Sequence, residues 1–240
     1  MKARVNKHIY TQTSLDSASL TMLGTVIHNF PEPGVYTGTI LLKKEEVGSF
    51  RLTVDGESQV MGINIDLASL HQQNPKHCDC KSTDDFIVNP KGYTQFFVSK
   101  GAGGYSVVLG GLNKKGKETK VFDSHTLGKG DIFAVTMIRP GTYTFANTQT
   151  KEKGEIIVAY PKTGKVPYRS PNPVSIECKK EGLSQNSIKI SAAQGIVYTI
   201  DTPTRIKIDL VKPDDGPKKN RKHKRIGWKK QVTRAHTTSS

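Results

Sequence analysis

The stretch RPGTYTFANTQTKEKGEIIVAYP, from Arg139 to Pro161, decides the fold class of this chain. Its Pro-Gly pair favours a turn, and Tyr143 and Phe145 then alternate with small residues. The charged loop TQTKEK leads into the apolar run EIIVAY. Alternation of this kind is typical of a strand that buries one face, so the stretch predicts an antiparallel β-hairpin.

A similar pattern of short apolar runs and turn residues continues through most of the 240 residues. Apolar and β-branched runs lie between Pro, Gly or charged turns, and turn signals recur about every ten residues, a spacing typical of sandwiches and barrels. In SFRLTV, for example, Phe50, Leu52 and Val54 alternate with polar residues. Only residues 64–73 favour a short helix. We therefore expect an all-β chain.

Two segments of the sequence echo each other. PGVYTGTILLKKEEVGSFRLTV (33–54) and PGTYTFANTQTKEKGEIIVAY (140–160) both begin with Pro-Gly-x-Tyr-Thr, and both continue through charged residues and a glycine into an apolar strand. Duplication of a sandwich unit is one explanation, which would give two related β units. The other is that both segments are ordinary hairpins with ordinary turns.

Residues 123–161, DSHTLGKGDIFAVTMIRPGTYTFANTQTKEKGEIIVAYP, resemble the carboxy-terminal part of the cupredoxin family of blue-copper β-sandwiches. In that family a strand after Leu-x-x-Gly-Asp leads to Pro-Gly-x-Tyr, and the chain crosses a ligand loop before a final apolar strand. The matching residues here are Leu127, Gly130, Asp131, Phe133, Pro140, Gly141, Tyr143, Phe145, Gly154, Ile156 and Val158. The resemblance extends weakly back to Phe86, and 176–200 looks like an opening pair of strands. It implies a cupredoxin-like Greek-key β-sandwich.

The copper ligands of the family are missing from this sequence. A blue-copper site needs two imidazoles, a thiolate and usually a methionine. Asn147 stands where the family places its cysteine, and the loop TQTKEK holds neither His nor Met. The upstream His position falls near Tyr105 or Ser106. We expect the fold without a copper cofactor.

Composition and turn signals suggest a division of the chain. The expected parts are a flexible amino-terminal arm (1–14), an amino-terminal β unit (15–73), a His/Cys loop (74–85), the cupredoxin-like sandwich (86–160), a Pro-rich linker (161–173), strands that complete a sandwich (174–213) and a disordered basic tail (214–240).

Positive charge is concentrated at the carboxy terminus. The chain has 36 Lys and Arg against 21 Asp and Glu, a net charge of +15. From residue 218 to the end, the tail holds nine of these basic residues, one tryptophan and no acid: Lys218, Lys219, Arg221, Lys222, Lys224, Arg225, Trp228, Lys229, Lys230 and Arg234. Such a run attracts polyanions by releasing their counterions, and Trp228 could stack on a base. The tail predicts binding to nucleic acid or an acidic protein; a solubilising end or a localisation signal is the alternative.

The densest set of metal-ligand types is His71, His77, Cys78 and Cys80. Imidazole and thiolate suit zinc or copper. Cys-x-Cys without a second paired module is a weak zinc signal, and a surface loop with two reduced thiols explains it equally well. A copper or zinc carrier is therefore the alternative function.

Catalytic patterns have no positive support in the sequence. Lys-Gly-Ala-Gly-Gly (100–104) lacks the Gly-Lys-Ser/Thr ending of a phosphate loop. Asp123, Ser124 and His125 are consecutive, whereas triads are assembled from separated elements. His28 fits a partly buried hydrogen-bonding histidine. We expect a non-catalytic binding or structural module whose sandwich contacts another protein and whose tail engages a polyanion.

The sequence also bears on the compartment. The longest apolar runs are far below the roughly 20 residues that cross a bilayer, so no membrane contact is expected. The first twenty residues lack the apolar region of a secretory signal, and three cysteines are too few for a disulfide scaffold. These features predict a cytoplasmic protein.

Overall fold

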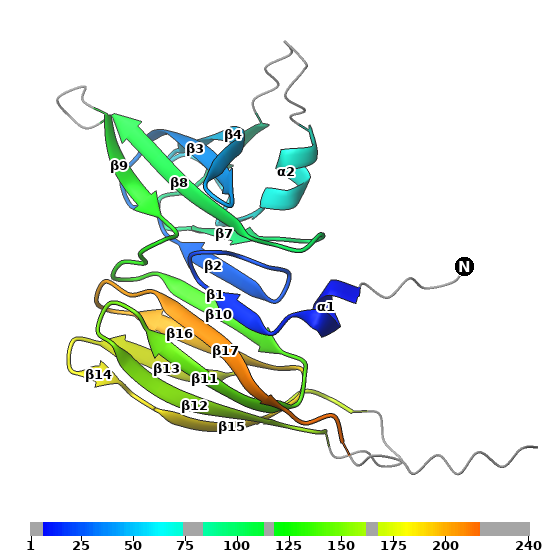
Figure 1. Cartoon of the computed structure of the whole chain (residues 1–240). Coiled ribbons are helices and arrows are strands. Elements are labelled where there is room, and N and C mark those ends of the chain that lie inside the picture. Colours follow the sequence, from blue (N-terminus) through cyan, green and yellow to red (C-terminus); the bar gives the residue numbers. More distant parts are fainter. Residues whose placement is uncertain (1–6, 74–83, 113–117, 162–167, 217–240) are drawn as a thin grey trace, which may run out of the picture.

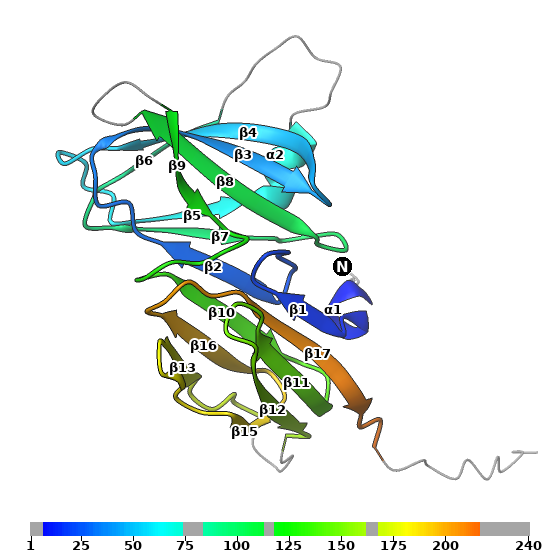
Figure 2. The ribbon, with the colours of Figure 1, turned by 60° about the vertical axis from the view of Figure 1, so that its left-hand side comes forward.

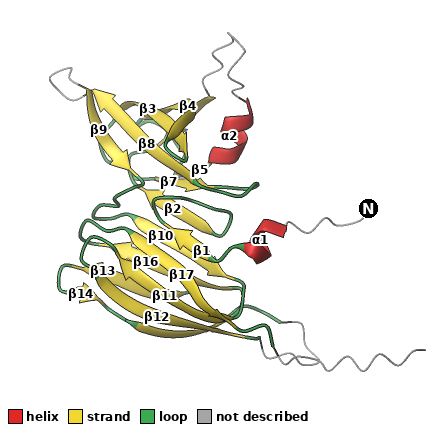
Figure 3. Cartoon of the chain, in the orientation of Figure 1, coloured by secondary structure: helices red, strands yellow, loops and turns green. Residues whose placement is uncertain are grey.

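The computed structural model describes residues 7–73, 84–112, 118–161 and 168–216. Strands dominate this part of the chain, and two short helices lie at its periphery (Figure 3). The strands form three sheets that stack along the molecule (Figures 1 and 2). The expectation of an all-β, sandwich-like chain is confirmed.

The elements follow one another in this order: α1 Lys7–Thr11, β1 Ser14–Asp16, β2 Gly24–His28, β3 Gly34–Leu42, β4 Glu45–Val54, β5 Gly62–Asp66, α2 Leu67–Gln73, β6 Asp84–Val88, β7 Tyr93–Phe97, β8 Tyr105–Leu112, β9 Glu118–Asp123, β10 Ile132–Met137, β11 Gly141–Asn147, β12 Glu152–Ala159, β13 Val174–Lys179, β14 Gly182–Leu183, β15 Ser187–Ser191, β16 Gln194–Ile200 and β17 Ile206–Pro213.

Two predicted segments have different local structures from those expected. The range 1–14 includes α1 and the first residue of β1. The predicted helix 64–73 begins only at Leu67, because Asn64 to Asp66 pair with β7. Asp66 ends the strand and caps the helix, since its Oδ1 accepts a hydrogen bond from the amide of Ala68 at 3.1 Å.

A seven-stranded sheet runs through the middle of the molecule in the order β14-β13-β16-β10-β2-β7-β5. A five-stranded sheet, β6-β4-β3-β8-β9, lies at one end, and another, β1-β17-β11-β12-β15, lies at the other (Figure 1). Buried side chains from all three sheets form one continuous hydrophobic core. Burial of that apolar surface is the main favourable term in the stability of the fold.

The strand pairs of the first half recur in the second half with the same directions. In the central sheet, β2-β7-β5 corresponds to β10-β16-β13, with one antiparallel and one parallel pair in each set. In the outer sheets, β6-β4-β3-β8 corresponds to β15-β12-β11-β17, again with matching directions. Unrelated hairpins would not reproduce every pair. The topology therefore supports the duplication explanation.

The strand pairing divides the chain differently from the division expected for residues 86–160. All of β6 to β9 pair with strands of the first half: β6 with β4, β7 with β2 and β5, β8 with β3, and β9 with β8. Strand β10 is the first that pairs with a strand of the second half, β16. Within 174–213, β16 pairs with β10, β17 with β11 and β15 with β12. The boundary falls in the short connection between β9 and β10, which has no linker composition.

Each half also gives its first strand to the other. Strand β1 precedes the first half but pairs with β17, and β9 precedes the second half but pairs with β8. Leu15-Asp16-Ser17 and Phe122-Asp123-Ser124 stand at the same distance before the Pro-Gly turns. The Ser17 amide donates to the Ile206 carbonyl, and the Ile206 amide donates back to the Ser17 hydroxyl oxygen; Ser124 and Val107 are joined in the same way. The two halves are thus interlocked by an exchange of strands.

The halves meet where β2 and β10 run antiparallel in the central sheet. Val26 lies opposite Phe133, and both are fully buried. These two residues stand at the same distance before Gly34 and Gly141, so an approximate twofold axis passes between them. Such an axis relates the two ends of this ladder: the terminal pair Gly24–Val135 corresponds to His28 and Asp131, which lie one position beyond the other terminal pair, Ile27–Ile132.

The predicted hairpin of the opening stretch is confirmed as β11 and β12, which pair antiparallel. The Tyr143 hydroxyl donates to the carbonyl of Arg139 at 2.8 Å, and the Tyr36 hydroxyl donates to that of Glu32 at 2.6 Å. The repeated Pro-Gly-x-Tyr motif is therefore a structural device that ties each tyrosine to the turn before its strand.

Candidate functional site

The sequence-predicted site residues are only partly within the described ranges. The basic residues 218–234, with His77, Cys78 and Cys80, lie outside them. His71 lies in α2, and its Nδ1 is 2.9 Å from the Tyr105 hydroxyl. Burial, followed by the charge of Asp66, raises the pKa of Tyr105. Over the described ranges no group of three or more His, Cys, Asp or Glu is arranged to hold a metal ion.

Asn147, at the thiolate position of the resemblance, is a buried structural residue. Its Oδ1 accepts hydrogen bonds from the amides of Gln149 at 3.1 Å and Arg205 at 3.5 Å, and its Nδ2 donates to the Thr204 hydroxyl at 3.4 Å. The side chain is 1% exposed. The amide therefore supports the turn after β11 and its junction with β17.

The consecutive residues Asp123, Ser124 and His125 do not converge. Ser124 is buried and its Oγ accepts the Val107 amide at 3.0 Å, which fixes the hydroxyl as part of the strand connection. Asp123 accepts hydrogen bonds from Lys120 and from the backbone and ring of His125. Burial raises the pKa of Asp123, but these hydrogen bonds outweigh it and hold the pKa below its usual value.

The outward face of the central sheet is a continuous uncharged surface. Strand alternation places one set of residues of β7, β2, β10 and β16 on this face, opposite the core. We call it the central face, and its members are Tyr93, Gln95, Phe97, Thr25, Ile27, Ile132, Ala134, Thr136, Gly195, Val197 and Thr199. None of them is acidic or basic.

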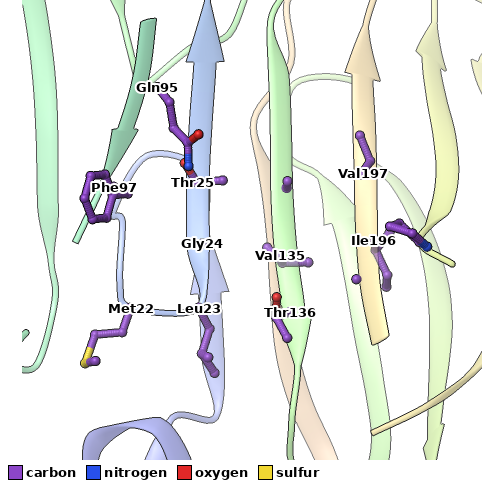
Figure 4. A pocket seen from close by; sticks show the side chains of 13 residues that line it. Met22, Leu23, Gly24, Thr25, Gln95, Phe97, Val135, Thr136, Ile196 and Val197 are labelled. Atoms are coloured by element: carbon purple, nitrogen blue, oxygen red, sulfur yellow. The ribbon is translucent and has the colours of Figure 1, made fainter. Parts of the chain in front are cut away.

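A groove of about 360 Å³ lies on the central face (Figure 4). Phe97 and Met22 lie on one side of it and Val197 on the other, with Thr25 and Thr136 between them (Figure 4). The outer sheet β1-β17-β11-β12-β15 differs, because Glu155, Lys189 and Lys207 are exposed there. Charge is thus absent from one sheet face rather than from the surface as a whole.

A second hollow, of about 680 Å³, lies where the two halves meet. Residues 28–36, which connect β2 to β3 and begin β3, line it together with Thr119 and Val121 of β9 and Lys129. We call it the junction cavity. Its apolar lining includes Phe30, Pro31 and Pro33, and its ionisable lining residues are His28, Glu32, Tyr36 and Lys129.

His28 in the junction cavity is held by Asp131 of the other half. Its Nδ1 lies 2.5 Å from Asp131 Oδ1, and the side chains are 17% and 3% exposed. The other carboxylate oxygen, Oδ2, accepts the Gly128 amide at 2.7 Å. Phe30 and Phe122 contact the ring, with centroids 4.4 and 4.5 Å away. An ionised carboxylate only accepts hydrogen bonds, so Nδ1 carries a proton and Nε2 is the remaining polar atom of the ring.

Comparisons with protein-family models, curated proteins and solved structures find no match to this chain. The fold and the site are therefore described from the chain itself. No helix in the described ranges is both long enough and apolar enough to span a membrane.

Sequence reasoning treated His28 and Asp131 separately, as a hydrogen-bonding histidine and a residue of the family pattern. Nothing local links two residues that lie 103 positions apart. A signal was nevertheless present in the internal echo. When the alignment of the two segments is extended upstream from the Pro-Gly turns, His28 aligns with Val135, and Asp131 aligns with Gly24. Each member of the pair therefore aligns with an uncharged residue of a different type in the other half.

Proposed function

We propose that this chain is a non-catalytic binding protein. Its central face contacts a protein partner, and its basic segment 218–240 engages nucleic acid or an acidic protein. The scaffold is a cupredoxin-like Greek-key sandwich in duplicate, without a copper site. The matching residues of 123–161 and the hairpin β11–β12 support that relationship, and the buried role of Asn147 agrees with the loss of copper.

The observation that carries the proposal is the uncharged central face on a chain of net charge +15. An antiparallel sheet with one face in water normally alternates apolar and polar residues, and charged side chains are common on the wet face. Continuous exposed surfaces with apolar side chains mark interaction sites in soluble proteins. On the central face, uncharged side chains run over four adjacent strands, from β7 to β16; most of them are half-buried, and Tyr93 is exposed.

A charged substitution tests this surface. Ala134→Arg places a guanidinium in the middle of the central face, next to the groove. Ile157→Arg is the matched control, since Ile157 is 38% exposed on an outer sheet. Proteins captured by wild type and by Ile157→Arg should be lost with Ala134→Arg, as measured by quantitative cross-linking with mass spectrometry. Equal capture by all three chains contradicts the proposed surface.

The basic segment is tested by truncation. Removing residues 218–240 lowers the net charge from +15 to +6, because nine basic and no acidic residues are lost. Full-length and truncated chains should be titrated with duplex DNA, single-stranded RNA and polyglutamate by fluorescence anisotropy at several salt concentrations. If all nine charges contact duplex DNA, log Kd changes with log salt by a slope of about eight. An unchanged Kd after truncation refutes this part of the proposal.

A copper or zinc carrier remains the second candidate function, with His71, His77, Cys78 and Cys80 as ligands. The one described member is His71, whose Nδ1 contacts the Tyr105 hydroxyl. Tight structural metal sites remain filled through purification, so elemental analysis discriminates directly. Less than about a tenth of an equivalent of Cu or Zn argues against a site of that class.

A further inference from the structure

We propose that the junction cavity binds a small organic anion, in which a carboxylate or phosphate group meets His28 and an apolar body fills the remaining space. This site is separate from the central face and from the basic segment. It can therefore be tested whatever the outcome for the proposed function.

The first step of the argument is the preorganisation of His28. Asp131 fixes one ring nitrogen, the Gly128 amide fixes Asp131, and two aromatic rings contact the imidazole. In the described part of the chain Nε2 has no hydrogen-bond partner. It is not one of the fully buried side-chain atoms that lack a partner, so Nε2 is accessible to a ligand. A ring held in this way presents Nε2 in one orientation, which lowers the cost of binding a ligand.

The second step is the charge of the site. When the ring carries protons on both nitrogens, Nε2 donates to an anion while Asp131 balances the positive charge of the ring. Lys129 adds a cation to the lining. Its side chain is 81% exposed, and its ammonium lies 3.4 Å from Asp201. Glu32 also lines the cavity and is exposed like Lys129, so water and salt screen the charges of both, and the partly buried His28 is the directed group.

The third step is the shape and the lining. About 680 Å³ is within the range of small-molecule sites, which are mostly apolar with a few fixed polar groups. Phe30, Pro31, Pro33 and Val121 supply apolar contacts, and His28 supplies the directed polar one. This combination fits a ligand that has an apolar body and a single anionic end.

The fourth step comes from the duplicated fold. The Gly24–Val135 pair occupies the place in the β2–β10 ladder that corresponds to His28–Asp131. That pair closes its end of the ladder with a glycine and an apolar side chain, so the scaffold does not need an imidazole and a carboxylate there. A partly buried imidazole–carboxylate pair that the scaffold does not require is a candidate for a binding role.

The experiment uses the full chain and three probes of similar size: benzoate, phenyl phosphate and benzyl alcohol. Carbon-detected NMR of the histidine rings reports which imidazole responds, and isothermal titration gives Kd. We expect benzoate or phenyl phosphate to bind and to shift the His28 resonances, and benzyl alcohol to bind at least tenfold more weakly. The two anions decide between a carboxylate and a phosphate ligand.

Two variants locate the site. His28→Gln should weaken anion binding at least tenfold. His125→Gln should not, although His125 also contacts a carboxylate, because it does not line the cavity. Lys129→Ala changes an exposed position and should weaken anion binding severalfold. It replaces His28→Gln as the test variant if His28→Gln fails to fold. Equal binding of benzyl alcohol, equal binding by His28→Gln, or no response of the His28 ring to either anion overturns the proposal.

Discussion

Two glycines opposite phenylalanines give the sharpest test of how the core is packed. Gly38 pairs with Phe50 across β3 and β4, and Phe145 pairs with Gly154 across β11 and β12. The two halves thus place the ring on opposite strands of the equivalent hairpin. Both rings are fully buried. In each pair the ring lies over the glycine, where a Cβ atom would overlap it.

Alanine at either glycine should destabilise the fold through overpacking, by about 1–3 kcal/mol. Neither glycine has a positive φ, so the backbone tolerates alanine and the cost comes from contacts alone. The surroundings differ, however. A Cβ at position 38 meets only the Phe50 ring at closest range, whereas one at position 154 also lies 2.5 Å from the carbonyl oxygen of Asn186.

This difference predicts which alanine can be rescued. Phe→Leu removes ring carbons at a cost of roughly 2 kcal/mol, from about 0.8 kcal/mol per buried carbon. The double variant Gly38→Ala/Phe50→Leu should cost about as much as Phe50→Leu alone, because the three atoms nearest to the added Cβ all belong to the ring. Phe145→Leu/Gly154→Ala should still cost at least about 1 kcal/mol more than Phe145→Leu, because the carbonyl of Asn186 remains.

Urea unfolding of the four single and two double variants gives both double-mutant cycles. Gly56→Ala is the matched control, since its Cβ meets nothing within 4 Å and its change should stay within about 0.5 kcal/mol. Equal rescue in both hairpins would refute the role assigned to the carbonyl of Asn186. A Gly38→Ala variant as stable as the control would refute the packing argument itself.

Three further predictions concern single residues. Burial raises the pKa of Asp66, but hydrogen bonds from two serines and two backbone amides outweigh it and lower the pKa below its usual value. The stability difference between wild type and Asp66→Asn should therefore be full above about pH 4 and shrink as pH falls below it, measured by urea unfolding at several pH values. Burial raises the pKa of the Cys178 thiol to about 12, so with the other two cysteines replaced by serine, Ellman's reagent should react at pH 8 only after unfolding. Arg205→Ala should cost about 1–2 kcal/mol in thermal or urea unfolding, since it leaves the carboxylate of Asp16 (12% exposed) without its bidentate partner, whereas Arg51→Ala, at an exposed pair, should cost clearly less than Arg205→Ala.

The sequence predicted what depends on local pattern. The hairpin of 139–161, the all-β class and the echo between the two Pro-Gly-x-Tyr segments follow from turn residues and period-two alternation. The predicted helix 64–73 was correct only from Leu67, since β-strand pairing with β7 overrode the local pattern before it.

The arrangement of the halves could not be predicted in the same way. Strand β9 continues the sequence pattern of its neighbours, so nothing in 118–123 indicates that it pairs with β8 of the first half. Strand β1 is three residues long, and its pairing with β17 joins the two ends of the described chain. Exchange of this kind is a property of long-range pairing, which no window of neighbouring residues contains.

The duplicated fold separates residues that serve the scaffold from residues that do not. Tyr36 and Tyr143 make the same bond in both halves and belong to the scaffold. His28 and Asp131 occur at one end of the β2–β10 ladder only. If they serve a ligand, replacing the charged pair together should spare the fold, whereas breaking it should not.

His28→Val introduces the residue that the second half has at this position, and it leaves the carboxylate of Asp131 buried without its partner. Removing one partner of a buried hydrogen-bonded polar group costs about 1–3 kcal/mol. His28→Val/Asp131→Asn removes the charge and keeps an oxygen for the Gly128 amide, so it should be more stable than His28→Val alone. Both variants should lose benzoate binding. If the double variant has a lower free energy of unfolding than His28→Val, Asp131 stabilises the junction even without His28. The two residues would then serve the scaffold rather than a ligand.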